Sequence, residues 1–286
     1  MSDGKNNFEK IKNMIEINKN YNESNLETMA KMPDCFVDLT VTSPPYDGLR
    51  TYKGYSFPFE EIAKELYRVT KEQGVLVWVV ADSVIDGSES GTSFKQALHF
   101  KEQGFNLHDT MIYQKNSYPF PPTNRYYQQF EYMFVFSKGK PKTTNLLKCE
   151  SGNNRRKSTQ RNKDGTTTSF TSEGNKERIM DNVWIEDTGY MRTTKDKEAY
   201  KHPAMFPESL SEKHILTWSN ENDLIYDCFM GSGTVAKMSI LNNRNWIGSE
   251  ISNEYCNIIE ERIKKAREEK RKEKDLTQKT LFGDGM

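Results

Sequence analysis

Two short segments of the chain carry side chains that could act together in chemistry. The first is the tetrapeptide Ser43-Pro44-Pro45-Tyr46, which follows the apolar run 36–41. Proline fixes its own φ angle and has no N–H group, so two consecutive prolines make a rigid corner where the strand ends. A hydroxyl, a fixed carbonyl and an aromatic ring at that corner can hydrogen-bond to a flat polar ligand and stack on it. A simple turn is the competing interpretation, because proline pairs often follow strands.

The second segment is LIYDCFMGSGT, residues 224–234, in which a predicted strand ends at Asp227 and a helix begins near Thr234. Gly231 and Gly233 would let a ligand approach the main chain, and the N–H groups of the helix N-terminus would face it. The spacing is neither that of a dinucleotide site nor that of a phosphate loop. The next predicted strand ends at Glu250, whose carboxylate can accept hydrogen bonds from the two hydroxyls of a ribose. Together these features predict a cofactor that contains a nucleoside.

Composition excludes several classes of protein. The 286 residues include 41 Lys and Arg and 41 Asp and Glu, so overall charge gives no indication of a nucleic-acid partner. No apolar run approaches the roughly 20 residues of a membrane span, and the first residues lack a signal-peptide pattern. We therefore expect no membrane contact and a cytoplasmic location. The four cysteines have no C-x-x-C spacing, which predicts buried thiols and no metal site.

The spacing of apolar residues predicts strands alternating with helices on both sides of an irregular block. Strands are expected at 36–41, 74–80, 105–113, 130–136, 224–226 and 245–251, and helices at 59–70, 93–103, 207–218, 234–241 and 254–269. This alternation predicts a doubly wound α/β fold with a mainly parallel sheet and helices on both faces.

The block between the two alternating parts has a different composition. It contains SGNNRRKSTQRNKDGTTTS, which is rich in basic and hydroxyl side chains. A solvated linker has this character, but so does a surface that contacts phosphates and base edges. We therefore divide the chain into a first half at 1–137, an insertion at 138–201, a second half at 202–262 and a charged tail at 263–286. Charges of alternating sign at helical spacing predict a solvated helix end for the tail.

The order of these motifs carries a family resemblance. The tetrapeptide resembles the catalytic SPPY of DNA amino-methyltransferases, and DCFMGSGT at 227–234 resembles their D-P-F-x-G-S-G-T motif for S-adenosyl-L-methionine (AdoMet), with Cys228 in place of proline. A catalytic tetrapeptide, a variable region and then the cofactor motif is the order of the β class. Segments 59–80, 130–139, 181–184 and 202–208 also resemble family segments. The Gly-Asp that often closes the adenine pocket is not found in INKNYNESNLETM, so that part of the pocket is unassigned.

The resemblance implies the Rossmann-like fold of AdoMet-dependent methyltransferases with an inserted target-recognition region. It implies AdoMet as the cofactor and double-stranded DNA as the partner, with a cognate restriction endonuclease as a further candidate partner and either a monomer or a homodimer. The residues expected to bind AdoMet are His202, Phe206, Asp227, Phe229, Gly231, Ser232, Gly233, Thr234 and Glu250. The residues expected to contact DNA are Arg50, Tyr52, Arg125, Arg155, Arg156, Lys157 and Arg161.

The expected chemistry follows from the electronic structure of an exocyclic amine. Its lone pair is delocalised into the base, so the nitrogen is flat and a poor nucleophile. Hydrogen bonds from the amine to the Ser43 hydroxyl and the Pro44 carbonyl would localise the lone pair, while Tyr46 stacks on the base. The base must first be flipped out of the duplex. Serine at position 43, where many adenine enzymes have aspartate, favours cytosine N4 over adenine N6.

Three alternatives stay open on the sequence alone. The chain could be an N6-adenine DNA methyltransferase, because adenine N6 poses the same electronic problem. It could be a DNA-binding module that keeps the fold without catalysis, although Ser43 and the glycines are intact. It could also be an RNA or protein-glutamine methyltransferase, but the glutamine enzymes commonly have asparagine at the position of Ser43.

Overall fold

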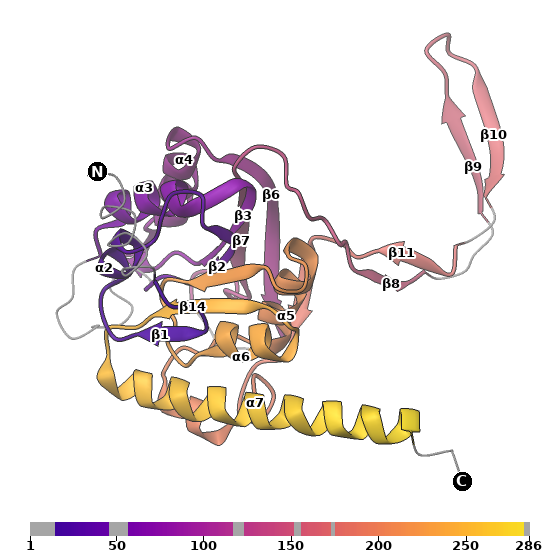
Figure 1. Cartoon of the computed structure of the whole chain (residues 1–286). Coiled ribbons are helices and arrows are strands. Elements are labelled where there is room, and N and C mark those ends of the chain that lie inside the picture. The colour runs from indigo at the N-terminus through magenta and orange to yellow at the C-terminus, as the bar shows by residue number, and fades with distance from the viewer. Residues whose placement is uncertain (1–14, 46–56, 117–122, 152–155, 173–174, 283–286) are drawn as a thin grey trace, which may run out of the picture.

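A central sheet of eight strands organises the computed structural model, which describes residues 15–45, 57–116, 123–151, 156–172 and 175–282. Across the sheet the strands follow the order β1 (Lys19–Tyr21), β14 (Asn245–Ser249), β13 (Leu224–Asp227), β2 (Val37–Thr42), β3 (Thr70–Val80), β7 (Phe130–Ser137), β6 (Asn106–Lys115) and β12 (Val183–Glu186). All neighbours are parallel except that β7 runs antiparallel to both β3 and β6. The predicted doubly wound, mainly parallel α/β fold is confirmed (Figure 1).

Helices cover both faces of this sheet (Figure 1). One face carries α2 (Asn25–Ala30), α3 (Phe59–Val69) and α4 (Thr92–Glu102), and the other carries α5 (Glu208–Trp218), α6 (Thr234–Leu241) and α7 (Asn253–Phe282). Helix α3 illustrates why these segments are helical. Its apolar residues are buried at helical spacing, and acidic residues in its first turn and Arg68 in its last complement the helix dipole. Burial of both faces explains why the strands read as continuous apolar runs.

Every strand and helix that periodicity predicted overlaps an observed element. The elements that it missed are short or polar. They are β1, α2, β4 (Val84–Ile85), β5 (Ser88–Glu89), β8 (Lys148–Glu150), β9 (Arg156–Arg161), β10 (Thr167–Ser172), β11 (Glu177–Ile179), β12 and the 3-10 helix η1 (Lys197–Lys201). The prediction of buried thiols is confirmed for Cys228 and Cys256, but Cys149 is only partly buried and Cys35 is exposed in a turn with φ of 53°.

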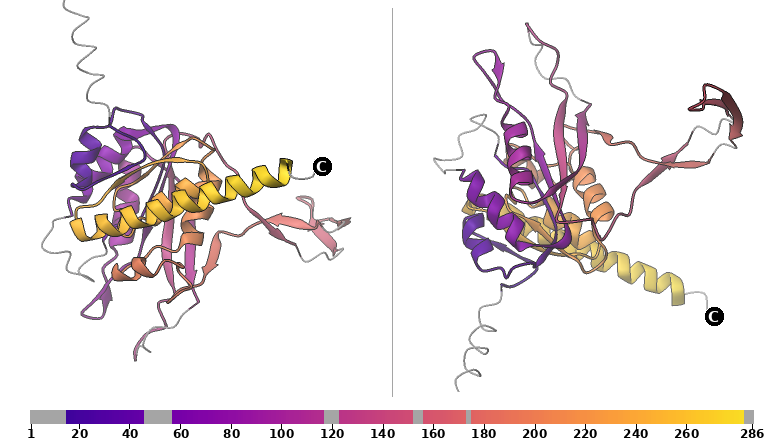
Figure 2. Two further views of the ribbon diagram at one scale, coloured as in Figure 1. Left: turned by 60° about the horizontal axis from the view of Figure 1, so that its bottom comes forward. Right: turned by 90° about the horizontal axis from the view of Figure 1, so that it is seen from above.

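The insertion is less uniform than its composition suggested. Strand β12 lies inside it in sequence but pairs with β6 in the central sheet. Strand β8 pairs with β11 and β9 pairs with β10, both antiparallel, and these two ribbons form an arm that projects from the body (Figures 1 and 2). At the end of the chain, α7 runs without interruption through residue 263 and extends the helix predicted at 254–269 into the charged tail.

The arm leaves the sheet at the amino ends of the parallel strands. Because β7 is antiparallel, its last residue lies beside the start of β3, where Gln73 N–H donates to the Lys138 carbonyl at 2.6 Å. The chain then passes the end of α5, where Asn145 N–H donates to the Thr217 carbonyl at 2.8 Å. The arm therefore starts at the end of the sheet opposite the carboxyl ends of β2, β13 and β14. Among the described residues, no helix is both long and apolar enough to cross a membrane.

Candidate active site

The two sequence motifs meet at the carboxyl ends of neighbouring parallel strands. Ser43 follows β2, Asp227 ends β13 and Glu250 follows β14, and these three strands are adjacent in the sheet. The Thr42 hydroxyl donates to Asp227 Oδ1 at 2.7 Å, and Phe229 N–H donates to the same oxygen at 3.0 Å. One carboxylate therefore connects the base of the tetrapeptide to the start of the glycine turn. The carboxyl edge of such a sheet is where ligands bind in open α/β folds.

Asp227 is a buried carboxyl with an altered acidity. Burial disfavours its charged form and raises its pKa to about 7, against the hydrogen bonds from Thr42 and Phe229. The charge of Glu250 acts in the same direction as burial. Without a bound ligand, Asp227 is therefore partly protonated near neutral pH.

This raised pKa predicts a pH-dependent stability. The folded protein binds the Asp227 proton more tightly than the unfolded chain, so the group contributes stability below about pH 4 that is lost as the pH rises through about 7. Between about pH 5 and about pH 8, the free energy of unfolding should fall more in the wild type than in Asp227→Asn, by on the order of 1 kcal/mol or more. Urea unfolding of both proteins without AdoMet measures this difference. Equal pH dependence in the two proteins would contradict the assignment.

The turn after β13 requires glycine at two positions. Gly231 has φ of 52° and Gly233 has φ of 80°, a region that side-chain-bearing residues rarely adopt. A Cβ atom at Gly233 would lie 3.1 Å from Ile259 Cγ1 on α7, so this glycine also permits close packing. A Cβ atom at Gly231 would lie 3.2 Å from two ring atoms of His202. The turn is therefore held between α7 and the segment that carries His202.

Glu250 faces this turn through its carboxylate. Gly231 N–H donates to its Oε2 at 2.9 Å and Ser252 N–H donates to its Oε1 at 2.8 Å. Burial raises its pKa, and the backbone hydrogen bonds oppose that rise. Each carboxylate oxygen has more than one acceptor direction, so both oxygens keep capacity for ligand hydroxyls. Its position fits the role of a ribose acceptor next to the glycines.

The remaining aromatic residues expected at the cofactor site come from two segments, residues 202–206 and the turn after β13. His202 is buried, with its ring centroid 4.4 Å from that of Tyr255, and its Nδ1 accepts from Ala204 N–H at 3.2 Å. Phe206 is partly buried against the core under α5 and α6. Phe229 packs against Phe57 and the indole ring of Trp78, on the face of the sheet opposite Phe206. These contacts fix the start of the turn.

Ser232 and Thr234 have a different environment from the one expected. Both are less than 5% exposed, and the guanidinium of Arg262 donates to the hydroxyl of each at 3.1 Å and to the Ser232 carbonyl at 2.7 Å. Arg262 is itself fully buried. Sequence reasoning missed it because it lies among the charged residues of a helix predicted to be solvated at its end, just before the predicted tail.

The tetrapeptide is described in part. Pro44 is buried, and Ser43 and Pro45 are half-buried. Tyr46, Arg50, Tyr52 and Arg155 lie outside the described residues, and only the backbone of Arg156 is described.

The other residues expected to contact DNA lie in two separate places. Arg125 donates to the Gly87 carbonyl at 2.8 Å in the turn between β4 and β5, beyond the carboxyl end of β3, and therefore lies at the same edge as Ser43. Lys157 and Arg161 are exposed on β9 of the arm, which leaves the opposite edge.

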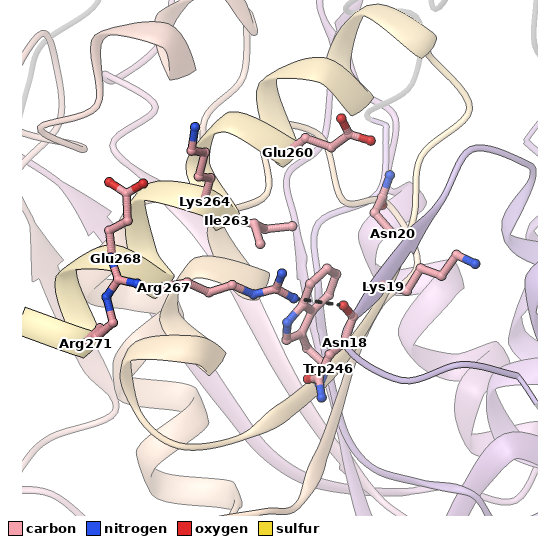
Figure 3. A pocket seen from close by; sticks show the side chains of 10 residues that line it. All are labelled: Asn18, Lys19, Asn20, Trp246, Glu260, Ile263, Lys264, Arg267, Glu268 and Arg271. Carbon is pink, nitrogen blue, oxygen red and sulfur yellow. Dashed lines mark hydrogen bonds between the residues drawn. The ribbon is translucent and has the colours of Figure 1, made fainter. Parts of the chain in front are cut away.

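A cavity of about 630 Å³ lies elsewhere, between the amino ends of β1 and β14 and helix α7 (Figure 3). Trp246 and Ile263 lie at its floor, and charged side chains such as Arg267 and Glu268 surround it. None of the residues expected to bind AdoMet or DNA lines it. Among the described residues, no cluster of three or more His, Cys, Asp or Glu could hold a metal ion.

Comparison with known proteins decides the family. The family model described as N6_N4_Mtase, DNA methylase, matches residues 37–261. The orphan methyltransferase M.BamHII of Bacillus amyloliquefaciens is 59% identical over 238 residues, covering 81% of this chain and 90% of that protein. The chain belongs to the N6_N4_Mtase family of DNA methylases. It is a sequence-specific DNA methyltransferase that uses AdoMet and acts on double-stranded DNA, as the motifs predicted.

A more distant sequence relative and two solved structures are also similar to this DNA methyltransferase. The Type II methyltransferase M.BglII of Bacillus subtilis is 25% identical, covering 85% of this chain and 68% of that protein. Among solved structures, the cytosine-N4-specific PvuII DNA methyltransferase aligns with a TM-score of 0.66 at 20% identity, covering 87% of each chain. A putative DNA modification methylase of Thermus thermophilus, solved with S-adenosyl-L-methionine, aligns with a TM-score of 0.56 at 21% identity, covering 87% of this chain and 95% of that one. These two structures support the fold alone.

Proposed function

We propose that this methyltransferase transfers the AdoMet methyl group to the exocyclic N4 of a cytosine flipped out of DNA. The observation that carries the proposal is the convergence of Ser43, Asp227 and Glu250 at the ends of three adjacent parallel strands. When bound, AdoMet supplies an electrophilic methyl group on a sulfonium. The protein's task is to bring a flat amine to that methyl group and make its lone pair available.

The Ser43 oxygen and the Pro44 carbonyl would each accept one N–H of the amine. Both acceptors are held in place by their surroundings. Pro44 is buried, and Ser43 directly follows Thr42, the last residue of β2, whose hydroxyl is hydrogen-bonded to Asp227. With both N–H groups engaged, the nitrogen lone pair points at the methyl carbon. Ser43 and Pro44 would hold the amine in this position while it accepts the methyl group, and the methylated amine would release one proton to solvent. No cysteine is needed as a nucleophile, since no covalent bond to the ring forms.

We propose that AdoMet lies along the glycine turn, with its ribose hydroxyls on Glu250. Gly231 and Gly233 allow the turn its left-handed φ angles and its close packing against His202 and α7, and His202 and Phe206 would line the AdoMet site beside the turn. Phe229 and Asp227 fix the start of the turn. Ser232 and Thr234 would act from within the turn through their bonds to Arg262. The residues around the turn offer a carboxylate that can accept hydrogen bonds from ribose hydroxyls. They also offer backbone N–H donors and aromatic rings, which suit an adenine.

The DNA would occupy the end of the sheet formed by the carboxyl ends of the strands, where Arg125 donates to the Gly87 carbonyl beyond β3. Arg50 and Tyr52, which follow Ser43 in the sequence, are proposed DNA contacts as well. The β9–β10 ribbon of the arm is a second proposed DNA contact. Lys157, Thr159 and Arg161 alternate along β9 and therefore share one face. A lone two-stranded ribbon is marginally stable in water, but such a ribbon fits the major groove of B-DNA. Arg155 and Arg156 would add to its positive charge.

Neutralising the described part of this basic face should change the salt dependence of binding. In Lys157→Ala/Arg161→Ala we expect weaker binding to all duplexes and a smaller slope of log affinity against log salt, by about 2, because fewer counterions are released. A filter-binding or anisotropy titration at several salt concentrations measures the slope. The control is Lys264→Ala/Lys272→Ala, which removes two exposed lysines of α7. If the slope were unchanged in the arm variant, the arm would not contact DNA and would be a solvent-exposed projection.

Cytosine N4 and adenine N6 are distinguished by the modified nucleoside. DNA from a host without endogenous methylation that expresses this protein should contain N4-methylcytosine. N6-methyladenine would support the alternative that the family also contains. DNA without either, from a protein that binds AdoMet and DNA, would favour the inactive DNA-binding module.

The setting of the reaction is also proposed. The relative M.BamHII is named an orphan methyltransferase, whereas M.BglII is named a Type II methyltransferase. A cognate restriction endonuclease is therefore a candidate partner and not a required one. Monomer and homodimer both fit the proposal, as does a cytoplasmic location.

A further inference from the structure

Four charged side chains form a cluster beneath the glycine turn, in which the two cations are buried and the two carboxylates are partly buried. Lys237 of α6 and Arg262 of α7 supply two positive charges, and Asp196 before η1 and Glu208 at the start of α5 supply two negative charges. Lys237 Nζ lies 3.0 Å from Asp196 Oδ2 and 2.9 Å from Glu208 Oε1. Arg262 Nε lies 2.9 Å from Asp196 Oδ2, and its Nη2 lies 2.5 Å from Glu208 Oε1. The charges balance within the cluster.

Arg262 is the member that reaches the turn. Its third nitrogen, Nη1, donates to the Ser232 carbonyl at 2.7 Å and to the hydroxyls of Ser232 and Thr234 at 3.1 Å. One planar guanidinium therefore holds two carboxylates on one side and the turn on the other. A planar fork of donors is suited to such bridging, whereas an ammonium is a compact point charge.

The two carboxylates bracket the segment that faces the turn. Asp196 and Glu208 stand at the beginning and end of residues 196–208, and His202 lies between them with its ring against Gly231. Arg262 thus fixes both ends of this segment and the turn that it covers. The position of segment 196–208 relative to the glycine turn, which together line the proposed AdoMet site, is therefore set by one residue.

We propose that Arg262 is a positioning residue, which holds the segment 196–208 against the glycine turn and so fixes the shape of the AdoMet site that both would line. The inference rests on the proposed placement of AdoMet at this turn. Stability alone does not account for the cluster, because buried ion networks are often no more stabilising than apolar residues of the same volume. Arg262 is fully buried, so it acts on AdoMet through the turn and not by contact.

The test separates position from stability with two variants of Arg262. Arg262→Lys keeps the charge but cannot bridge, and we expect its KM and Kd for AdoMet to rise about tenfold while kcat at saturating AdoMet changes little. Arg262→Met/Glu208→Gln removes one charge of each sign and leaves the pair Lys237–Asp196, so it should recover the melting temperature without recovering AdoMet affinity. Calorimetry below the melting temperature measures the affinity of folded protein.

The matched control is Lys265→Met. Lys265 forms an exposed pair with Glu198 at 2.7 Å, which joins α7 to η1 without reaching the turn, so AdoMet binding should be unchanged. Wild-type AdoMet affinity in Arg262→Lys, or in the stable double variant, would overturn the proposal. A wild-type protein that binds AdoMet but yields no N4-methylcytosine would instead contradict the proposed function and leave the role of Arg262 intact.

Discussion

Replacing Ser43 by alanine is expected to lower the single-turnover rate of methyl transfer about a hundredfold, the typical cost of losing one preorganised hydrogen-bonding partner in a transition state. The hydroxyl oxygen would hold one of the two amine N–H groups, and without it the lone pair stays partly in the ring. Affinities for AdoMet and DNA should change much less than the rate. Rapid-quench transfer of labelled methyl to duplex DNA measures this difference.

The control for this change is Ser88→Ala. Ser88 is an exposed serine of β5, beyond the carboxyl end of β3, and should be dispensable. If Ser43→Ala retained its full single-turnover rate, the proposed hydrogen bond from the amine to the Ser43 hydroxyl would be contradicted. A loss of AdoMet affinity as large as the loss of rate would assign Ser43 to cofactor binding.

Replacing Glu250 by alanine is expected to weaken AdoMet binding on the order of a hundredfold, because two hydrogen bonds to a charged acceptor at roughly 1.5 kcal/mol each would be lost. The same change also frees Gly231 N–H, which donates to Glu250 at 2.9 Å. Glu250→Gln keeps one acceptor oxygen and should lose less. Isothermal titration calorimetry with AdoMet measures both variants.

Glu261→Ala removes an exposed carboxylate of α7 and serves as the control. Its AdoMet affinity should equal that of the wild type. If Glu250→Ala kept the wild-type affinity for AdoMet and its fold were intact by circular dichroism, Glu250 would not be the ribose acceptor.

The sheet and its helices were predictable because their signal is local. Strands such as 74–80 are continuous apolar runs, and α3 shows apolar residues at helical spacing with complementary charges at its ends. The glycine turn and Glu250 were predictable for the same reason, since each follows a recognisable strand. The order of two motifs then placed both at one edge of a parallel sheet.

The parts that sequence did not reveal depend on tertiary structure. Strands β9 and β10 have polar residues on both faces, so no apolar alternation marks them. The antiparallel direction of β7 decides which edge the arm leaves, and no local pattern encodes it. Arg262 resembles its charged neighbours in sequence, and only the packing of α7 against the turn buries it.

The central claim is that this family member methylates the exocyclic amine of cytosine in DNA. The most direct test incubates purified protein with methyl-labelled AdoMet and genomic DNA, digests the DNA to nucleosides and identifies the labelled product by mass. We expect label in N4-methylcytosine, and little of it when Ser43→Ala is used. Label in N6-methyladenine would overturn the base assignment, and label in 5-methylcytosine or in no nucleoside would contradict the proposed chemistry altogether.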